Sequence, residues 1–178
     1  ETRRIYSILY SERHENRATI RAGELVKAGA IGKVIQTIGL GPHRMNPKTR
    51  PDWFFKKEQY GGILTDIASH QFDQFLSFTG STRAEVVASQ VGNVHHPQFP
   101  GLEDFGDALV RGNGGTGYIR VDWFTPDGLS TWGDGRLTIL GEFLAITSVV
   151  MCGLFIVIDM GQPSRVLNVL LHPAPSSM

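Results

Sequence analysis

The sequence between residues 61 and 73 is Gly61-Gly62-Ile63-Leu64-Thr65-Asp66-Ile67-Ala68-Ser69-His70-Gln71-Phe72-Asp73. After the two glycines, apolar residues recur at helical spacing as far as Phe78, and Gly80 can end a helix there. The apolar positions gather on one side of that helix: Leu64, Ile67, Ala68, Phe75 and Phe78. We therefore expect a helix over roughly Leu64–Phe78 that packs this side against a sheet.

The other side of the expected helix carries titratable residues. Asp66, His70 and Asp73 stand at i, i+4 and i+7, so at roughly 100° per residue they share one stripe. A carboxylate one turn before an imidazole can orient the ring and raise its pKa, as a general acid/base pair requires. Two other interpretations stay open on geometry alone. One is an exposed ion pair worth roughly 0.2–0.5 kcal/mol, and the other is a metal site, for which the sequence shows no third ligand.

The residues before this stretch predict a strand, a helix and a second strand. Residues 4–10 are rich in β-branched and aromatic types, as a strand would be. Ala18, Ala22, Leu25 and Val26 then share a helical face, and two glycines at 29 and 32 can cap that helix. Residues 34–41 resume as a strand, and a long polar-aromatic loop over 42–60 follows. Loops of that length are more often functional than not.

The residues after the expected helix over 64–78 predict an antiparallel sheet. Candidate strands cover 85–94, 107–111, 118–124 and 136–140, with turn-forming clusters such as Thr125-Pro126-Asp127-Gly128 between them. Helices followed by several strands with short connections indicate an α+β fold. We expect an open, mostly antiparallel sheet with helices packed on one face.

The segment Gly112-Asn113-Gly114-Gly115-Thr116-Gly117 satisfies the dinucleotide-binding pattern G-x-G-x-x-G. That pattern binds a pyrophosphate only where it follows a strand and opens a helix. Residues 118–124 alternate as a strand does, so we interpret the glycines as a hairpin turn.

Composition excludes several classes of protein. The 178 residues hold 17 Lys+Arg and 17 Asp+Glu, and 41% of them are hydrophobic. This is a globular balance, and a neutral chain with no basic run gives no reason to expect a nucleic-acid partner or an anionic membrane surface. The single cysteine, Cys152, excludes an intrachain disulfide and a zinc site built from several thiolates.

Two segments, residues 1–4 and 143–158, bear on where in the cell the protein is located. The charged start over residues 1–4 does not read as a signal peptide, so we expect a cytoplasmic protein. The apolar run Phe143–Ile158 has sixteen residues, fewer than the roughly 20 that span a bilayer. We expect a buried strand pair or a core helix there and no membrane span.

The motif over residues 61–73, Gly-Gly followed by Asp-x-x-x-His-x-x-Asp behind a Trp-bearing loop, resembles the Gfo/Idh/MocA family of NAD(P)-dependent oxidoreductases. Two further segments support the resemblance, Ala30-Ile31-Gly32-Lys33-Val34 and Arg136-Leu137-Thr138-Ile139-Leu140-Gly141. It covers about residues 1–141.

The resemblance implies a domain plan. Family members have an N-terminal Rossmann domain that binds the cofactor and a glyceraldehyde-3-phosphate dehydrogenase-like C-terminal domain that contributes to substrate and oligomer contacts. On that plan, residues 1–12 are a remnant of the last strand of a missing Rossmann domain. Residues 13–141 are the substrate and oligomerisation domain, and 142–178 are a divergent apolar segment and tail. The Rossmann fingerprint and the family's Glu-Lys-Pro motif are absent, so we expect this chain to be inactive alone.

The resemblance also implies site residues. Asp66 and His70 match the family's catalytic Asp and His, which serve hydride transfer between NAD or NADP and a hydroxyl or carbonyl carbon of a sugar or polyol. The cofactor would be bound mainly by the missing domain, and no metal is expected. We assign four loop residues to substrate contact from their chemistry and location: His43, Arg44, Arg50 and Trp53. Self-association through an apolar sheet face is expected to give a homo-oligomer.

Two other functions remain open at this stage, a non-catalytic sugar-binding module and a purely structural dimerisation domain. An enzyme needs both Asp66 and His70. A binding module should keep its ligand affinity in His70→Ala, and in a dimerisation domain neither residue should matter.

Overall fold

The structure is a computed structural model that describes residues 3–143, and the chain up to Gly141 forms one compact unit. Its α-helices are α1 (Ser11–His14), α2 (Arg17–Lys27), α3 (Lys57–Tyr60), α4 (Ile63–Asp66) and α5 (Ala68–Thr79). Two 3₁₀ helices, η1 (Pro47–Thr49) and η2 (Asp52–Phe55), lie between β1 and α3. The strands are β1 (Val34–Pro42), β2 (Ala84–Gly92), β3 (Phe105–Gly112), β4 (Thr116–Asp122) and β5 (Arg136–Gly141).

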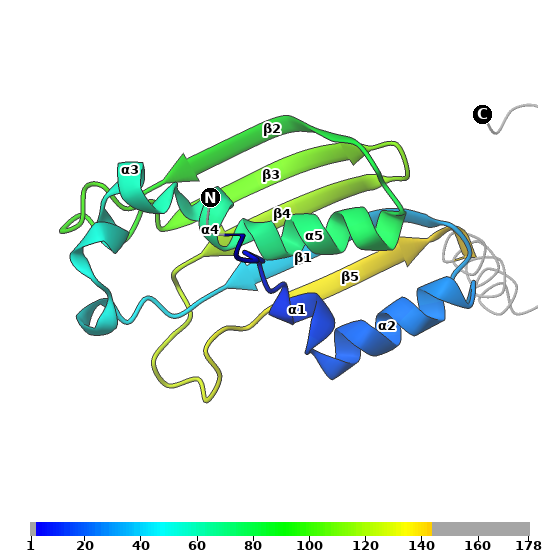
Figure 1. Cartoon of the computed structure of the whole chain (residues 1–178), viewed down its shortest axis with the longest axis horizontal. Helices are drawn as coiled ribbons and strands as arrows, with labels where there is room; N and C mark the ends of the chain where they lie inside the picture. The colour runs from blue at the N-terminus through cyan, green and yellow to red at the C-terminus, as the bar shows by residue number, and fades with distance from the viewer. Residues whose placement is uncertain (1–2, 144–178) are drawn as a thin grey trace, which may run out of the picture. The chain divides into compact units, whose positions relative to one another are not determined.

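The five strands form one open sheet in the order β2-β3-β4-β1-β5. Three neighbouring pairs are antiparallel, and only β1 and β4 run parallel. Figure 1 shows α5 lying over β4 and β1, with α1 and α2 on the same side. The predicted α+β fold, a mostly antiparallel sheet with helices on one face, is therefore confirmed.

The core lies between α5 and the middle of the sheet. Phe75 on α5 and Ile119 and Val121 on β4 are each at most 1% exposed. Burying a side chain of this kind stabilises the fold by roughly 1.5–3 kcal/mol. The helix can approach closely because Gly117 has no side chain. A Cβ there would lie 2.8 Å from the Phe75 ring and 2.7 Å from Val110 Cγ2.

The predicted helix over residues 64–78 is two helices, α4 and α5, which meet at Ile67. Its apolar side packs as expected, with Ile67, Ala68, Phe75 and Phe78 buried. The two preceding glycines have a specific role. Gly62 has φ = 91°, and a Cβ on it would lie 2.4 Å from Glu103 Oε2. A larger residue would therefore be strained and would displace this carboxylate, which accepts a hydrogen bond from the Ile63 N–H at 3.0 Å.

The predicted strand over residues 4–10 is wrong. The segment forms no regular element, and Ile5 and Tyr6 are 97% and 90% exposed. A strand needs a neighbour that accepts and donates backbone hydrogen bonds, and within residues 3–143 no strand pairs with this segment.

The segment 42–60 is not a structureless loop, because it contains η1, η2 and α3. Phe54 and Tyr60 pack inward, at 4% and 9% exposed, whereas Trp53 is 50% exposed. Apart from Phe143, the predicted apolar run over 143–158 lies outside the described residues, as does Cys152. Between residues 3 and 143, no helix has the length and apolar character needed to cross a membrane.

The glycine-rich segment 112–117 is the hairpin turn that the sequence predicts. β3 ends at Gly112 and β4 begins at Thr116, and the Gly112 N–H donates to the Gly115 carbonyl at 2.8 Å. Because no helix follows, its backbone cannot form the phosphate cradle of a dinucleotide site.

Replacing Gly117 with alanine should lower the free energy of unfolding by about 1–3 kcal/mol, because the new methyl group must displace Phe75 or Val110. Urea denaturation measures the change. Gly135→Ala is the matched control, since its Cβ would meet only the Leu40 carbonyl at 3.8 Å and its stability should change by less than about 0.5 kcal/mol. Equal stability of both variants would contradict the packing described here.

Candidate active site

A pocket of about 400 Å³ opens where the helices α3, α4 and α5 meet the loops that follow β1 and β4. Its lining includes charged, imidazole and aromatic side chains: His43, Arg50, Trp53, Phe54, Gln59, Tyr60, Asp66, Ile67, His70, Trp123 and Trp132. Residues far apart in the sequence therefore share one cavity beside the start of α5.

Asp66 and His70 enter the pocket from the junction of two helices. Asp66 is the last residue of α4 and His70 lies in the first turn of α5. The His70 ring packs against the edge of Tyr10 with centroids 5.9 Å apart, and its buried Nδ1 has no hydrogen-bond partner. Burial lowers the pKa of His70 and the nearby His43 lowers it further, while the charges of Asp73 and Asp66 raise it. The lowering prevails, so the ring is mostly neutral at pH 7 and can accept a proton.

His43 is a second neutral imidazole on the pocket wall. Its Nδ1 donates a hydrogen bond to the Gly41 carbonyl at 3.0 Å, since a carbonyl can only accept. In the neutral ring, Nε2 is therefore the acceptor. Burial lowers the pKa of His43, against smaller opposing effects that include the charge of Asp66.

Arg50 supplies the positive charge of the pocket. Its guanidinium lies over three rings, with centroid distances of 4.4 Å to Phe54, 4.8 Å to Trp123 and 5.2 Å to Trp132. Cation–π contacts of this kind are worth roughly 0.5–2 kcal/mol each and hold the group in place. Burial raises the pKa of the Asp66 carboxyl, and the charges of Arg50 and the two histidines partly oppose that rise.

Five of the six residues predicted for the site line this one pocket: His43, Arg50, Trp53, Asp66 and His70. Arg44 does not. Its Nη2 donates to the carbonyls of Pro126, Leu129 and Thr131, and its Nε lies 3.6 Å from Asp127, so it holds the loop after β4. The helix-stripe residue Asp73 is also used elsewhere, because it forms an ion pair with Arg13 of α1.

The sequence analysis missed several lining residues. Trp123 directly follows β4 and Trp132 lies in the loop after it. Both are at least 50 residues from the motif, and the sequence carries no local signal that joins them to it. Tyr60 accepts a hydrogen bond from the Glu103 N–H at 2.8 Å, and burial raises its pKa to about 12. Its hydroxyl is therefore neutral and serves the fold.

Glu12 lies behind His43, in a second cavity of about 250 Å³ whose wall His43 also forms. Its carboxylate accepts a hydrogen bond from Gln71 Nε2 at 2.7 Å, and burial raises its pKa to about 7. In the described part of the chain, no group of three or more His, Cys, Asp or Glu side chains could hold a metal ion.

The fold and the site together define a class of α+β domain that sets a carboxylate and an imidazole beside a pocket at one edge of a sheet. The GFO/IDH/MocA C-terminal domain model matches residues 19–146, and the chain belongs to this family. Comparison with curated protein sequences found no match.

Among solved structures, a protein from Erwinia carotovora atroseptica assigned as an oxidoreductase is 60% identical, with a TM-score of 0.74 over 77% of this chain and 41% of its own. The myo-inositol 2-dehydrogenase of Lactobacillus plantarum is 22% identical (TM-score 0.63, 78% of this chain and 40% of its own). Levoglucosan dehydrogenase, solved with NADH and levoglucosan, is 20% identical (TM-score 0.60, 78% and 38%). The two distant structures show the shared fold, and the chain spans about 40% of the length of these proteins.

The charge of Asp66 raises the pKa of both pocket histidines. Asp66→Asn should therefore lower the pKa of His43 and His70 further, with the chain still folded. Following the ring signals by NMR between pH 4 and 8 measures both titrations. Asp52→Asn, at an exposed aspartate outside the pocket, should leave them unchanged, and equal effects of the two variants would refute the proposed coupling.

Glu12 should make the protein less stable as the pH rises. Its folded pKa of about 7 lies above the ordinary 4.5, so the stability it contributes is full below pH 4.5 and is lost as the pH climbs through about 7. Glu12→Gln keeps a hydrogen-bond acceptor for Gln71 and removes the charge. It should raise the free energy of unfolding at pH 8 by about 1–3 kcal/mol and have little effect at pH 4. Denaturation at the two pH values tests this, and an equal effect at both would contradict it.

Proposed function

We propose that this chain is the substrate domain of an oxidoreductase that moves hydride between NAD or NADP and a hydroxyl or carbonyl carbon of a sugar or polyol. The observation that carries the proposal is that Asp66 and His70, the pair that matches the family's catalytic motif, line one pocket with a second neutral imidazole and a fixed guanidinium. A domain that serves only dimerisation would not need these titratable side chains around one pocket.

In the oxidation direction, His70 takes the proton of a substrate hydroxyl. The ring can do so because its lowered pKa leaves it neutral at pH 7. The imidazolium that forms is stabilised by the charges of Asp73 and Asp66, which already favour the protonated ring in the resting structure. In the reduction direction the same proton returns to the carbonyl oxygen.

The pocket wall suits a polyhydroxylated ring. Trp53, half-exposed, and Trp132 offer aromatic faces to the C–H side of a sugar ring. The guanidinium of Arg50 supplies donors, and the Nε2 of a neutral His43 supplies an acceptor, for hydroxyl groups. The dehydrogenases of similar fold are named for myo-inositol and levoglucosan, which are ligands of this kind.

When bound, the nicotinamide cofactor supplies the carbon that accepts or donates the hydride. The pocket is consistent with such a partner, since its lining includes the apolar and aromatic surfaces of Ile67 and Trp53, which suit contact with a flat ring. Within residues 3–143 the one literal dinucleotide pattern is the hairpin turn after β3. The activity we propose therefore requires a nucleotide-binding domain in addition to the described part of the chain.

Within residues 3–143 no helix covers the face of the sheet away from α5, and this supports self-association. Ile38, Tyr118 and Leu109 stand side by side across β1, β4 and β3, on the face away from α5, and Leu109 is 48% exposed. An apolar row on a half-covered sheet favours contact with a second copy.

Hydride transfer can be tested by replacing the matched segment of the Erwinia protein, 60% identical to this chain, with residues 3–143. Reduction of NAD or NADP is followed by absorbance with myo-inositol, glucose and levoglucosan. His70→Ala should lower kcat by about 100-fold or more, because general acid/base catalysis contributes roughly 10²–10⁴-fold.

His14→Ala is the matched control, since His14 is exposed on α1 and lies outside the pocket. Its activity should equal that of the unaltered chimera. If a folded His70→Ala variant turned over as fast as the control, the acid/base assignment would fail. Sugar binding without turnover in every form would favour the binding-module alternative instead.

A further inference from the structure

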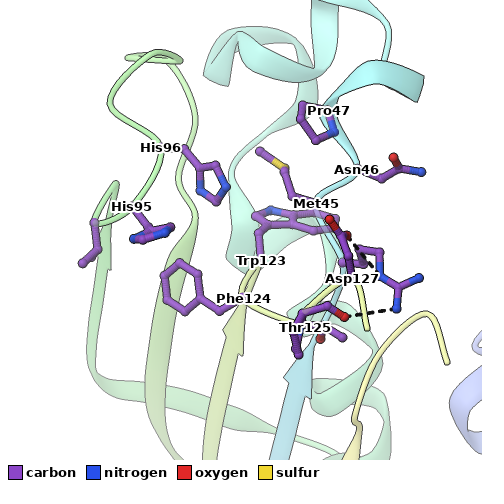
Figure 2. A pocket seen from close by; sticks show the side chains of 12 residues that line it. Met45, Asn46, Pro47, His95, His96, Trp123, Phe124, Thr125 and Asp127 are labelled. Carbon is purple, nitrogen blue, oxygen red and sulfur yellow. Dashed lines mark hydrogen bonds and ion pairs between the residues drawn. The ribbon is translucent and has the colours of Figure 1, made fainter. Parts of the chain in front are cut away.

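The loop that joins β4 to β5, residues 123–135, forms part of two cavities. Figure 1 shows it extending past the end of the sheet between these two strands. Its first residues line a cavity of about 440 Å³, and Figure 2 shows Phe124, Thr125 and Asp127 on the wall of that cavity. Further along, the same loop places Trp132 in the lining of the candidate active-site pocket. The position of the loop therefore affects the shape of that pocket.

The middle of the loop has no core of its own. Residues 126–132 are all exposed, and 47% of the surface of Trp132 is open to solvent. Burial of apolar side chains therefore contributes little to the position of this segment. A bond inside the loop, from the Leu129 N–H to the Pro126 carbonyl at 3.2 Å, closes a local turn and attaches it to nothing else. Contacts from outside the loop must hold the segment in place.

A single residue supplies the polar contacts. Within residues 3–143, Arg44 is the only residue outside the loop that forms hydrogen bonds or ion pairs with residues 126–132. Its backbone N–H donates to the Trp132 carbonyl at 2.9 Å. Its guanidinium Nη2 donates to three loop carbonyls, which belong to Pro126, Leu129 and Thr131. Its Nε makes no hydrogen bond and lies 3.6 Å from the Asp127 carboxylate.

The backbone of Arg44 is itself fixed to the end of the sheet. Arg44 pairs with Phe124 in an antiparallel bridge, and the neighbouring His43 carbonyl accepts the Thr125 N–H at 3.1 Å. These bonds join the chain after β1 to the chain after β4. The guanidinium then offers several donors in one rigid plane, whereas a lysine ammonium is a flexible point charge. The reach of this one side chain therefore determines where the outer part of the loop lies.

Trp132 depends on the loop more than its neighbours in the pocket do. Three rings surround the Arg50 guanidinium, and two of them, Phe54 and Trp123, are each 4% exposed and belong to the core. The half-exposed ring of Trp132 lies 5.2 Å from the same guanidinium, and this is its only ring contact within residues 3–143. Its position is therefore set mainly through the backbone that Arg44 holds.

We propose that Arg44 is a positioning residue, which acts through the loop on Trp132 and thereby sets how tightly the pocket holds a sugar ring. The inference rests on the proposed function and extends it to a residue that does not line the pocket. If release of the loop leaves Trp132 in its binding position for about a tenth of the time, the apparent affinity falls about 10-fold. Within residues 3–143, no hydrogen bond or ion pair joins Arg44 to α4 or α5, so Asp66 and His70 keep their places.

The kinetic test uses the Erwinia chimera that carries residues 3–143, with myo-inositol, glucose and levoglucosan. Arg44→Met removes the donors and keeps an apolar stem. It should raise KM about 10-fold for each sugar that reacts and change kcat by less than about 2-fold. Arg44→Lys should recover part of the loss, because it restores a donor and the charge opposite Asp127. Arg21→Met, the same change at an exposed arginine of α2, should leave both constants unaltered.

A double-mutant cycle tests the route through Trp132. In a Trp132→Ala background, Arg44→Met should raise KM by no more than about 2-fold, because the side chain that Arg44 positions is gone. Three results would each overturn the proposal: an unchanged KM in Arg44→Met, a fall in kcat as large as the rise in KM, or an undiminished rise in KM in the Trp132→Ala background.

The position of Trp132 is also measured without turnover, by NMR of the full chain. Its indole N–H signal, identified by its loss in Trp132→Ala, should shift in Arg44→Met and stay in place in Arg21→Met. A chimera that shows no turnover in any form would refute the proposed reaction. Calorimetric titration of the full chain with the three sugars then decides the role of Arg44. Binding about 10-fold weaker in Arg44→Met supports it, and equal or absent binding refutes it.

Discussion

The carboxylate of Glu103 holds the helices α3 and α4, which position the candidate active site. It lies just before β3, is 8% exposed, accepts the Ile63 N–H at the start of α4 and pairs with Lys57 of α3. A buried carboxylate is costly unless it is bonded and paired, so these contacts fix α3 and α4 against the sheet. Gly62 leaves the space for it. Asp66 and His70 follow within two turns of Ile63, and their position in the pocket is therefore set by an acidic residue that lies 40 positions after Ile63 in the sequence.

The sequence predicted what depends on local periodicity. The amphipathic helix, all five strands of the sheet, the glycine-rich hairpin and the shared stripe of Asp66 and His70 follow from spacing and turn chemistry. The prediction failed where contacts with residues distant in sequence determine the local structure. The segment 4–10 has the composition of a strand but no neighbour to pair with, and the segment 42–60 is polar and aromatic in sequence but folds around the buried Phe54. Neither Glu103 nor Trp123 could be tied to the motif, because both reach it only through the folded sheet.

Arg44 and Arg50 show why residue type and position in a loop are poor guides to role. They are six residues apart and carry the same group. Arg50 is surrounded by three rings in the candidate active-site pocket, whereas Arg44 holds the loop after β4 by its carbonyls. Trp123 lines both the pocket that contains Arg50 and a cavity of about 440 Å³ at the ends of β1 and β4. A substitution at Trp123 would therefore change both the cation–π contact of Arg50 and the shape of the 440 Å³ cavity.

The single parallel pair in the sheet, β1 and β4, has a consequence for how such a domain can diversify. Parallel strands end at the same edge, so the segments that follow them, 43–60 and 123–135, meet there although they are distant in sequence. Asp66 and His70, the residues proposed for proton transfer, lie on helices packed against the core, while most of the remaining pocket wall comes from these two connections. Insertions or substitutions in these two connections can change the shape of the pocket and leave Asp66 and His70 in place. The residues proposed for proton transfer and most of those that shape the pocket are thereby encoded in separate stretches of the gene.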